Sequence, residues 1–427
     1  MPRGPVVASP VPGAVPQNPG DVIQSSVWNA TVNDIYNIFN TIQPIEYGGN
    51  GVADGKPLDN SFGIKNSTDL TKIGIFSAAN IPTATTRTYT LPATSGTLAL
   101  TSDTINASNL AISASVSANA LTVSLKGADG NDPSPTNVVN VLFRNVTPAT
   151  GTPTSIAITA ATSLVISSGS TVGFSNATAG RVWIVGFNDG GTFRLGAVNV
   201  LSGTSIMALR DGIYSSTAEG GAGAADSAQV IYTGTAVVSK AMAILGYMEW
   251  SAGLTAAGTW SIVPTEIQLF GEATSLPGEV IQSKRTSTGQ LASGTTTVPL
   301  DDTIPQITEG VEFMTVAISP KGAPNLINAT AKGYYAHTAD NAFVAQSIFR
   351  DSIANSLATS SAFMPFNGSS SEALTDVTVL AASTSSTTFR VRTGAQTAGD
   401  IQINGSNGSR RYGGVLNSFI EVEEIMA

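Results

Sequence analysis

The sequence predicts a mainly β protein, in which a short N-terminal arm and one short helix are followed by a series of β-sandwich modules. Short apolar runs recur at close spacing after residue 110, and Gly, Asn and Pro separate them, a pattern typical of sandwiches and barrels. Only one segment has helical spacing. Charged residues make up 11% of the 427 residues, compared with about 25% in an ordinary soluble domain, which favours a surface of hydroxyl and amide groups. This length corresponds to roughly two to four folded modules.

The composition also excludes several kinds of site. The chain has no Cys, so it cannot form a disulfide framework, a thiolate zinc site or a Cys nucleophile. A single His, His337, rules out multi-His metal sites within one chain. A net charge of −9 argues against binding of nucleic acid, which requires a basic surface. We therefore expect no metal, no cofactor and no nucleic-acid partner.

No apolar run reaches the roughly 18 residues that a membrane-spanning helix requires. The first 20 residues contain six Pro residues among several Gly, so they lack the apolar core of a signal peptide. We expect a protein that is assembled in a cytoplasm without membrane insertion. The same Pro-rich stretch predicts an extended arm, which is either a disordered tail or a segment that docks on a partner.

Residues 25–43 are the one good helix candidate. Ser25 or Ser26 can supply the N-cap oxygen, and Pro44 ends the pattern. Large apolar side chains recur at spacings of 4, 3, 4 and 3, as in a heptad seam. We predict that this seam serves oligomerisation or attachment, and its members are Trp28, Val32, Ile35, Phe39 and Ile42. A single amphipathic helix covering a small core remains the alternative, beside a three-chain bundle or a helix packed on a partner.

Composition shifts divide the chain into four parts. Residues 1–44 form the arm and helix, and residues 45–110 form a small β module with a linker from 103, including a hairpin at 86–100. Residues 111–275 form a middle β-sandwich module, and residues 276–427 form a C-terminal β-sandwich. The segments 19–25 and 276–283 are nearly identical, and we interpret both as the start of a module.

The two sandwich modules rest on specific strand predictions. In the middle module the expected strands are Leu121–Leu125, Val138–Phe143, Ser155–Thr159, Ser163–Ile166, Val182–Phe187, Phe193–Val198, Ala241–Glu249 and Ser261–Phe270. In the C-terminal module they are Phe313–Ile318, Leu326–Ala331, Thr387–Arg392 and Val415–Ile425. The small residues 220–225 predict a surface loop in the middle module.

Candidate catalytic groups are few, and each has a structural explanation. We expect His337 to be a hydrogen-bonded residue near a strand end. Asp301 and Asp302 are adjacent, so on a strand they would point to opposite faces and would not bracket a sugar bond. A catalytic pair of carboxylates contributed by two subunits remains an alternative. The sequence therefore predicts that the protein is not an enzyme.

The other conspicuous motifs also favour structural roles. Residues 129–132 resemble a calcium loop only faintly, since the alternating ligands and the final Glu are missing, and we predict a plain turn. Arg410 and Arg411 are expected in a solvated turn. Three tryptophans in β-like sequence are expected to pack in cores, with sugar stacking as the alternative: Trp183, Trp250 and Trp260.

Several segments resemble fibre proteins of tailed bacteriophages. Residues 21–51 resemble their N-terminal virion-attachment region, and residues 82–101 resemble a short β motif common in phage fibres. Residues 111–273 are similar to a middle module, and the segment after 276 is similar to a terminal β-sandwich. The motifs that carry the resemblance include Trp28-Asn29, Asn33-Asp34-Ile35, Gly48-Gly49-Asn50-Gly51, Thr88-Tyr89-Thr90-Leu91, Thr217-Ala218-Glu219-Gly220, Ala257-Gly258-Thr259-Trp260 and Gly405-Ser406-Asn407-Gly408.

This resemblance implies a structural protein of the virion: an elongated homotrimeric tail or neck fibre. The N-terminal region would bind tail, neck or portal-adaptor proteins, and the C-terminal sandwich would face a glycan or protein of the host surface. A head or collar fibre and a capsid decoration protein are alternatives of the same class. A polysaccharide-degrading tailspike and a bacterial surface adhesin are alternatives of other classes. No catalytic motif and no receptor-contacting residue follow from the resemblance.

Overall fold

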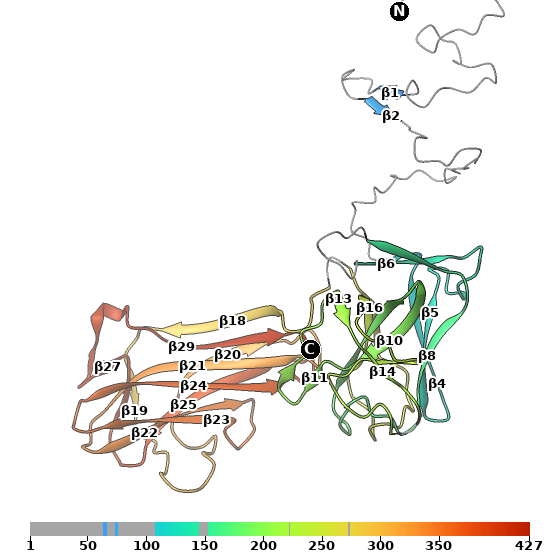
Figure 1. Ribbon diagram of the computed structural model, residues 1–427. Helices are drawn as coiled ribbons and strands as arrows, with labels where there is room; N and C mark the ends of the chain where they lie inside the picture. The colour runs from blue at the N-terminus through green and yellow to red at the C-terminus, as the bar shows by residue number, and fades with distance from the viewer. Residues whose placement is uncertain (1–62, 66–72, 76–106, 145–152, 222, 272–273) are drawn as a thin grey trace, which may run out of the picture. The chain divides into compact units, whose positions relative to one another are not determined.

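The computed structural model describes residues 107–427 except 145–152, 222 and 272–273, together with residues 63–65 and 73–75 (Figure 1). The chain divides into two units, residues 1–99 and 100–427, and each is considered alone. In the first unit, β1 (Gly63–Lys65) pairs antiparallel with β2 (Ile73–Ile75). The predicted arm, the helix at 25–43 with its seam, and the hairpin at 86–100 all lie outside the described residues.

The described chain is mainly β and folds into sandwich-like layers, which confirms the predicted fold class. Its helical content is a single 3-10 turn, η3 (Tyr412–Gly414). The strands before residue 272 are β3 (Ala107–Ser108), β4 (Ala111–Ser117), β5 (Ala120–Lys126), β6 (Val139–Phe143), β7 (Thr154–Ile158), β8 (Thr162–Ile166), β9 (Gly180–Asp189), β10 (Thr192–Val198), β11 (Leu201–Ser202), β12 (Ser205–Ile206), β13 (Gly212–Tyr214), β14 (Thr217–Ala218), β15 (Tyr232–Thr233), β16 (Lys240–Trp250) and β17 (Glu266–Leu269).

A large sheet forms the centre of this middle region. Its strand order is β13-β16-β9-β10-β15-β14, and β17 also pairs with β16. Strands β9 and β16 are buried along nearly their whole length, because their sequences are continuous apolar runs that can be covered on both faces. Two three-stranded sheets, β3-β6-β7 and β4-β5-β8, supply the packing partners of one face.

The core beneath these sheets is organised by aromatic side chains. The rings of Trp250 and Trp260 lie 5.3 Å apart, and Phe174 contacts both. Each indole is also satisfied, since Trp250 Nε1 donates to the Ile262 carbonyl at 3.1 Å and Trp260 Nε1 donates to the Ser170 carbonyl at 2.9 Å. Trp183 packs in a second cluster, 5.3 Å from Tyr247. The prediction that these tryptophans pack in cores is confirmed.

The strands after residue 275 form a second sandwich. They are β18 (Val280–Thr288), β19 (Ala292–Gly294), β20 (Val311–Ile318), β21 (Leu326–His337), β22 (Ala342–Arg350), β23 (Ala358–Met364), β24 (Ser370–Leu380), β25 (Thr387–Ala395), β26 (Ile401–Ile403), β27 (Gly405–Ser406), β28 (Ser409–Arg410) and β29 (Ser418–Ile425).

The C-terminal sandwich has the topology of a jelly roll. One sheet contains β18-β29-β21-β24, extended by β26 and β19, and the other contains β20-β25-β22-β23. The chain therefore folds back on itself in nested antiparallel pairs: β18 with β29, β20 with β25, β21 with β24 and β22 with β23. Double-sheet jelly rolls are built from such pairs. Apolar side chains from both sheets fill the space between them.

Gln346 is a polar side chain buried inside this core, and both its oxygen and its nitrogen are hydrogen-bonded. Gln346 of β22 accepts a hydrogen bond from the Tyr335 hydroxyl at 2.8 Å and donates to the Ala331 carbonyl at 3.0 Å and to Thr375 Oγ1 at 2.8 Å. The Tyr335 ring lies over Gly333, where a Cβ atom would come within 2.2 Å of the ring. Burial raises the pKa of the Tyr335 hydroxyl well above its ordinary value, so it remains a donor.

Several strand predictions need correction. The predicted strand at 261–270 is confined to β17, the last predicted strand begins at Ser418, and residues 107–108 of the supposed linker form β3. The segment that was interpreted only as a module start becomes β18, because β29 offers it an edge to pair with.

The small-residue run at 220–225 was expected on the surface. Gly220, Gly223 and Ala224 are exposed and lie in no strand, as expected, whereas Ala225 is fully buried and its carbonyl accepts a hydrogen bond from the Val172 amide. Strands β22, β23 and β24 were not predicted at all. The inward positions of β23 and β24 include Ala362, Ala373 and Thr375, which give little hydrophobic alternation in the sequence, and Gln346 interrupts the inward apolar residues of β22.

Hydrogen bonds around a buried ion pair join the two β regions of the second unit. Arg181 of β9 and Glu249 of β16 lie opposite each other in the sheet, with Nη2 and Oε2 2.7 Å apart and side chains only 3% and 6% exposed. Arg181 Nη1 also donates to Asn325 Oδ1 at 2.8 Å and to the Ala427 carbonyl. Asn325 in turn donates to Glu424 at 2.6 Å. The network therefore ties the central sheet to the C-terminal sandwich.

We predict that Arg181→Met lowers the free energy of unfolding by about 3–5 kcal/mol, because it leaves Glu249 buried without its cation. Denaturant unfolding followed by tryptophan fluorescence measures this. Lys332→Met is the matched control, since it breaks an exposed pair with Glu372 that contributes about 0–1 kcal/mol. Equal effects of the two substitutions would show that the buried pair has no special importance.

Candidate functional site

The predicted attachment seam cannot be placed in the fold. Its five residues, Trp28, Val32, Ile35, Phe39 and Ile42, precede the described part of the chain. Two other places in the described part bring candidate side chains together: one end of the C-terminal sandwich, which contains His337, and a hollow of the middle region.

Three connections meet at the end of the C-terminal sandwich that carries β27 in Figure 1. They link β21 to β22, β23 to β24 and β25 to β26. Backbone hydrogen bonds hold them together: the Thr338 amide donates to the Asp400 carbonyl at 3.2 Å, and the Gly368 amide donates to the His337 carbonyl at 2.9 Å. Ser406 of β27 donates to the Gly368 carbonyl at 2.6 Å. This end is therefore a fixed cluster of loops.

His337 lies at the centre of these connections. It ends β21, is almost fully buried, and its Nδ1 accepts a hydrogen bond from the Ala339 amide at 3.0 Å. The expectation of a hydrogen-bonded residue at a strand end is confirmed. Burial lowers the pKa of His337, while backbone contacts with Ala339 and Gly399 and the charge of Asp400 act in the opposite direction. The imidazole Nδ1 thus serves as a structural acceptor at the end of β21.

Exposed aromatic side chains lie beside this loop cluster. Phe343 and Phe363 are directly opposite each other on β22 and β23, with ring centroids 4.9 Å apart and exposures of 41% and 46%. Phe366, in the following loop, is 62% exposed. We call these three residues the Phe343 patch. Sequence analysis missed it, because an apolar residue in a strand gives no sign of whether it points inward or outward.

The backbone beneath the Phe343 patch is tightly fixed. The side-chain oxygen of Gln396 accepts a hydrogen bond from the Phe343 backbone amide at 2.5 Å. The backbone amide of Gln396 donates to the Phe343 carbonyl at 3.2 Å. Gln396 Nε2 also donates to the Asn341 carbonyl at 3.2 Å. The side chain of Asp340 accepts a hydrogen bond from the backbone amide of Asn367 at 2.6 Å. The aromatic rings are therefore presented from a rigid base.

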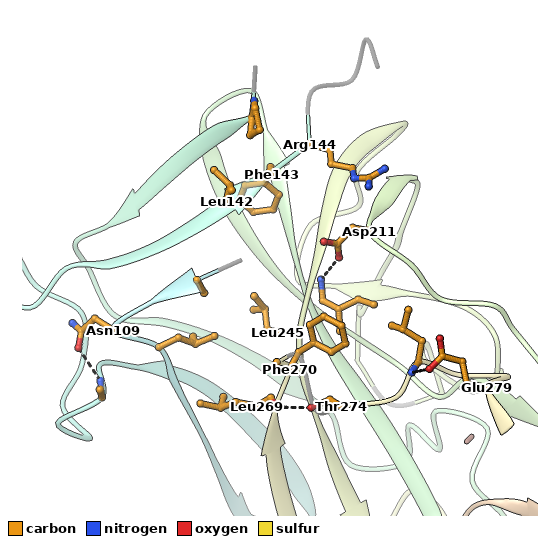
Figure 2. Close-up of a pocket in the computed structure, with 17 residues that line it drawn as sticks. Asn109, Leu142, Phe143, Arg144, Asp211, Leu245, Leu269, Phe270, Thr274 and Glu279 are labelled. Atoms are coloured by element: carbon orange, nitrogen blue, oxygen red, sulfur yellow. Dashed lines mark hydrogen bonds between the residues drawn. The ribbon is translucent and has the colours of Figure 1, made fainter. Parts of the chain in front are cut away.

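A hollow of about 930 Å³ opens in the middle region (Figure 2). Its wall is mainly apolar, with Phe143, Leu245 and Phe270 among the labelled side chains. Ala107, Arg144 and Gly271 also line it, and each adjoins in the chain a range outside the described residues. The described residues thus form only part of the wall, and we assign no ligand to the hollow.

Asp211 and Glu279 are the carboxylates among the described residues that line this hollow, and Arg144 also lines it. Asp211 Oδ1 accepts a hydrogen bond from the Ile244 amide at 2.9 Å. Burial raises the pKa of Asp211, while that hydrogen bond and the positive charge of Arg144 oppose the increase. The side chain therefore has a structural role in holding the loop before β13 to the edge of β16.

The other sequence candidates form ordinary turns. Asp129 accepts hydrogen bonds from the Asn131 amide and side chain, both at 3.0 Å, and from Asn137, as predicted for a plain turn. Asp301 likewise accepts from the Thr303 amide at 2.9 Å. Arg410 and Arg411 are exposed beside η3.

The described residues show neither a metal cluster nor a membrane-spanning helix. They contain no group of three or more His, Cys, Asp or Glu residues placed to hold a metal ion. None of their helices has the length and hydropathy needed to cross a membrane.

Comparison with known proteins gives little guidance. No family model and no curated protein matches the chain. Among solved structures, a chain in the structure of infectious bursal disease virus Gt strain is 10% identical to this one. The match covers 78% of this chain and 80% of that chain, with a TM-score of 0.21. The Eiger TNF of S. frugiperda is 10% identical over 34% of this chain and 94% of that chain, with a TM-score of 0.20. These likenesses are too slight to carry an argument.

We predict that His337 makes the protein less stable in mild acid. Since its folded pKa lies below the ordinary value of about 6.5, the unfolded chain takes up the proton first, and stability decreases as the pH falls from about 7 towards the folded pKa. The slope for one group is at most about 1.4 kcal/mol per pH unit.

Thermal melting at pH 7.5, 6.5 and 5.5 tests this for the wild type and His337→Asn. Because the chain has one His, the variant should lose less stability over this interval. An identical loss in both proteins would contradict the prediction.

Proposed function

We propose that this chain is a structural protein of a tailed-bacteriophage virion, a homotrimeric tail or neck fibre without enzymatic activity. Its N-terminal region, residues 1–44, binds other virion proteins, and its C-terminal sandwich faces a glycan or protein of the host surface. The fibre is assembled in the host cytoplasm and is located on the virion. Head or collar fibres and capsid decoration proteins are the alternatives within the same class.

The observation that carries the proposal is the order of the parts along the chain. The motifs at 21–51 and 82–101 that resemble phage fibres precede a middle β region, and a jelly-roll sandwich comes last. The last sandwich ends in a rigid cluster of loops bordered by exposed aromatic side chains. A fibre needs this arrangement, because one end must attach and the other must remain available.

The low charge of the chain supports an assembling protein. With only 11% charged residues, few charges need to be desolvated when surfaces of neighbouring subunits meet. Several fibre ends on one particle would also combine weak contacts into strong attachment, because tethering raises the effective concentration of each further contact.

Two buried carboxylates of the described part have structural partners, in agreement with the proposed non-enzymatic role. Glu249 pairs with Arg181, and Glu424 accepts hydrogen bonds from the Lys321 and Gly322 amides at 2.7 and 3.1 Å. These buried carboxylates are therefore engaged in structural contacts. A tailspike that cleaves polysaccharide would require an acid and a base facing a substrate groove.

We predict that the purified full-length chain has a solution mass three times the monomer mass of 43.5 kDa, measured by light scattering. Phe39→Asp should yield soluble chains that no longer trimerise, because it places a charge in the predicted seam. Asn40→Asp is the matched control, since it adds the same charge one position off the seam.

A stable wild-type monomer would contradict a self-assembling fibre. A Phe39→Asp trimer as stable as the wild type would instead remove the seam from the proposal. Imaging of labelled virions then locates the fibre base and separates a tail or neck position from a head position.

A further inference from the structure

The Phe343 patch combines features that a solvent-exposed strand end does not require. Three phenyl rings are 41–62% exposed, and two of them are paired across adjacent strands. Hydrogen bonds of Gln396 fix the backbone from which Phe343 projects. Contiguous exposed apolar groups on a rigid surface commonly mark an interaction site.

Two asparagines that lie near these phenylalanines in the chain indicate what kind of ligand fits. Asn341 and Asn367 are next to the patch in the chain, and neither side-chain amide has a hydrogen-bond partner within the described residues. Each amide offers two donors and an acceptor. A ligand that combines an apolar face with hydroxyl groups would use both the rings and the amides.

The charges of the neighbouring connections also bear on which class of ligand fits the patch. The three connections at this end, residues 338–341, 365–369 and 396–400, contain no Lys or Arg and include Asp340 and Asp400. His337 is buried, and its Nδ1 accepts a hydrogen bond from the Ala339 backbone amide. These three connections thus offer no cation to an anionic ligand, whereas an uncharged ligand needs none; the exposed Arg410 and Arg411 belong to the β27–β28 hairpin and the residue after it.

A second copy of this chain fits the patch less well. A stable interface between proteins buries about 1,200–2,000 Å², and three partly exposed phenyl rings supply only a small part of that area. A small ligand needs no such area. Sugar rings present C–H groups on one face, which can contact aromatic rings, and hydroxyl groups at the edge.

We propose that the Phe343 patch is a binding site for neutral pyranose sugars, with Phe343 and Phe363 under the C–H face of the ring. Asn341 and Asn367 donate hydrogen bonds to its hydroxyl groups. This inference rests on the proposed function, which it deepens by assigning the host contact to one surface and one chemical class.

Saturation-transfer NMR on the full-length protein tests the site. The probes are the methyl pyranosides of glucose, galactose, mannose, rhamnose and N-acetylglucosamine, with glucuronate as the anionic comparison. At least one neutral probe should receive saturation, and glucuronate should receive none. Phe343→Ser combined with Phe363→Ser should weaken binding at least tenfold.

Two further variants keep the result interpretable. Leu374→Ser removes an apolar side chain of similar exposure, 61%, on β24 and should bind like the wild type. Asn341→Asp keeps the shape of the side chain but removes its donors, so it should weaken binding even if the double variant fails to fold. No saturation of any neutral probe, or equal saturation in Asn341→Asp and the wild type, would overturn the site.

The test of the sugar site and the test of the trimeric fibre can give different results. A trimer that binds no sugar leaves the fibre proposal standing and removes the site. A monomer that binds a sugar through Phe343 keeps the site and removes the self-assembling fibre. Strong self-association that is lost in the double variant would identify the patch as a contact between copies, and would overturn the sugar proposal.

Discussion

The buried pair of Arg181 and Glu249 is the interaction on which the described unit depends. Both residues lie in strands covered on two faces, so neither charge can reach water. A buried charge is tolerated only with a partner and further hydrogen bonds. Arg181 obtains these from Asn325 and from the Ala427 carbonyl, which belong to the C-terminal sandwich. The central sheet and the sandwich must therefore form together for the pair to be satisfied.

The requirement that a buried polar group has hydrogen-bond partners also applies inside the jelly roll. Gln346 is fully buried, yet its amide is bonded to Tyr335, Ala331 and Thr375. These partners come from β21 and β24 of the opposite sheet, so the network sets how the two sheets align. Satisfied polar networks favour a single packing arrangement, because any shift leaves a buried group unpaired. A rigid sandwich is the result, and its loops are held in fixed positions.

Rigidity in the sandwich is what makes its loop end suitable for contact with a partner. Three connections share backbone hydrogen bonds around His337, and the exposed rings of Phe343 and Phe363 project beside them. Preorganised groups lose little entropy on binding. Weak contacts at such an end can act together only if the chain is held in several copies, so the proposed trimer and the proposed sugar site address two steps of the same attachment.

The sequence by itself determined the mainly β class, the position of most strands in the middle region and the burial of Trp183, Trp250 and Trp260. These features depend on local alternation of apolar residues and on turn residues, which can be recognised without a structure. Strands β23 and β24 escaped recognition, because small or polar residues such as Ala362, Ala373 and Thr375 occupy inward positions; β22 was also missed, since Gln346 interrupts its inward apolar residues Val344 and Ile348.

Only the tertiary structure decided the nested strand pairing, the partners of Arg181 and the outward direction of Phe343 and Phe363. Each depends on residues far apart in the chain, such as Arg181 and Asn325, which are 144 positions apart. No local pattern specifies which distant groups meet, because that choice is made by the packing of whole sheets.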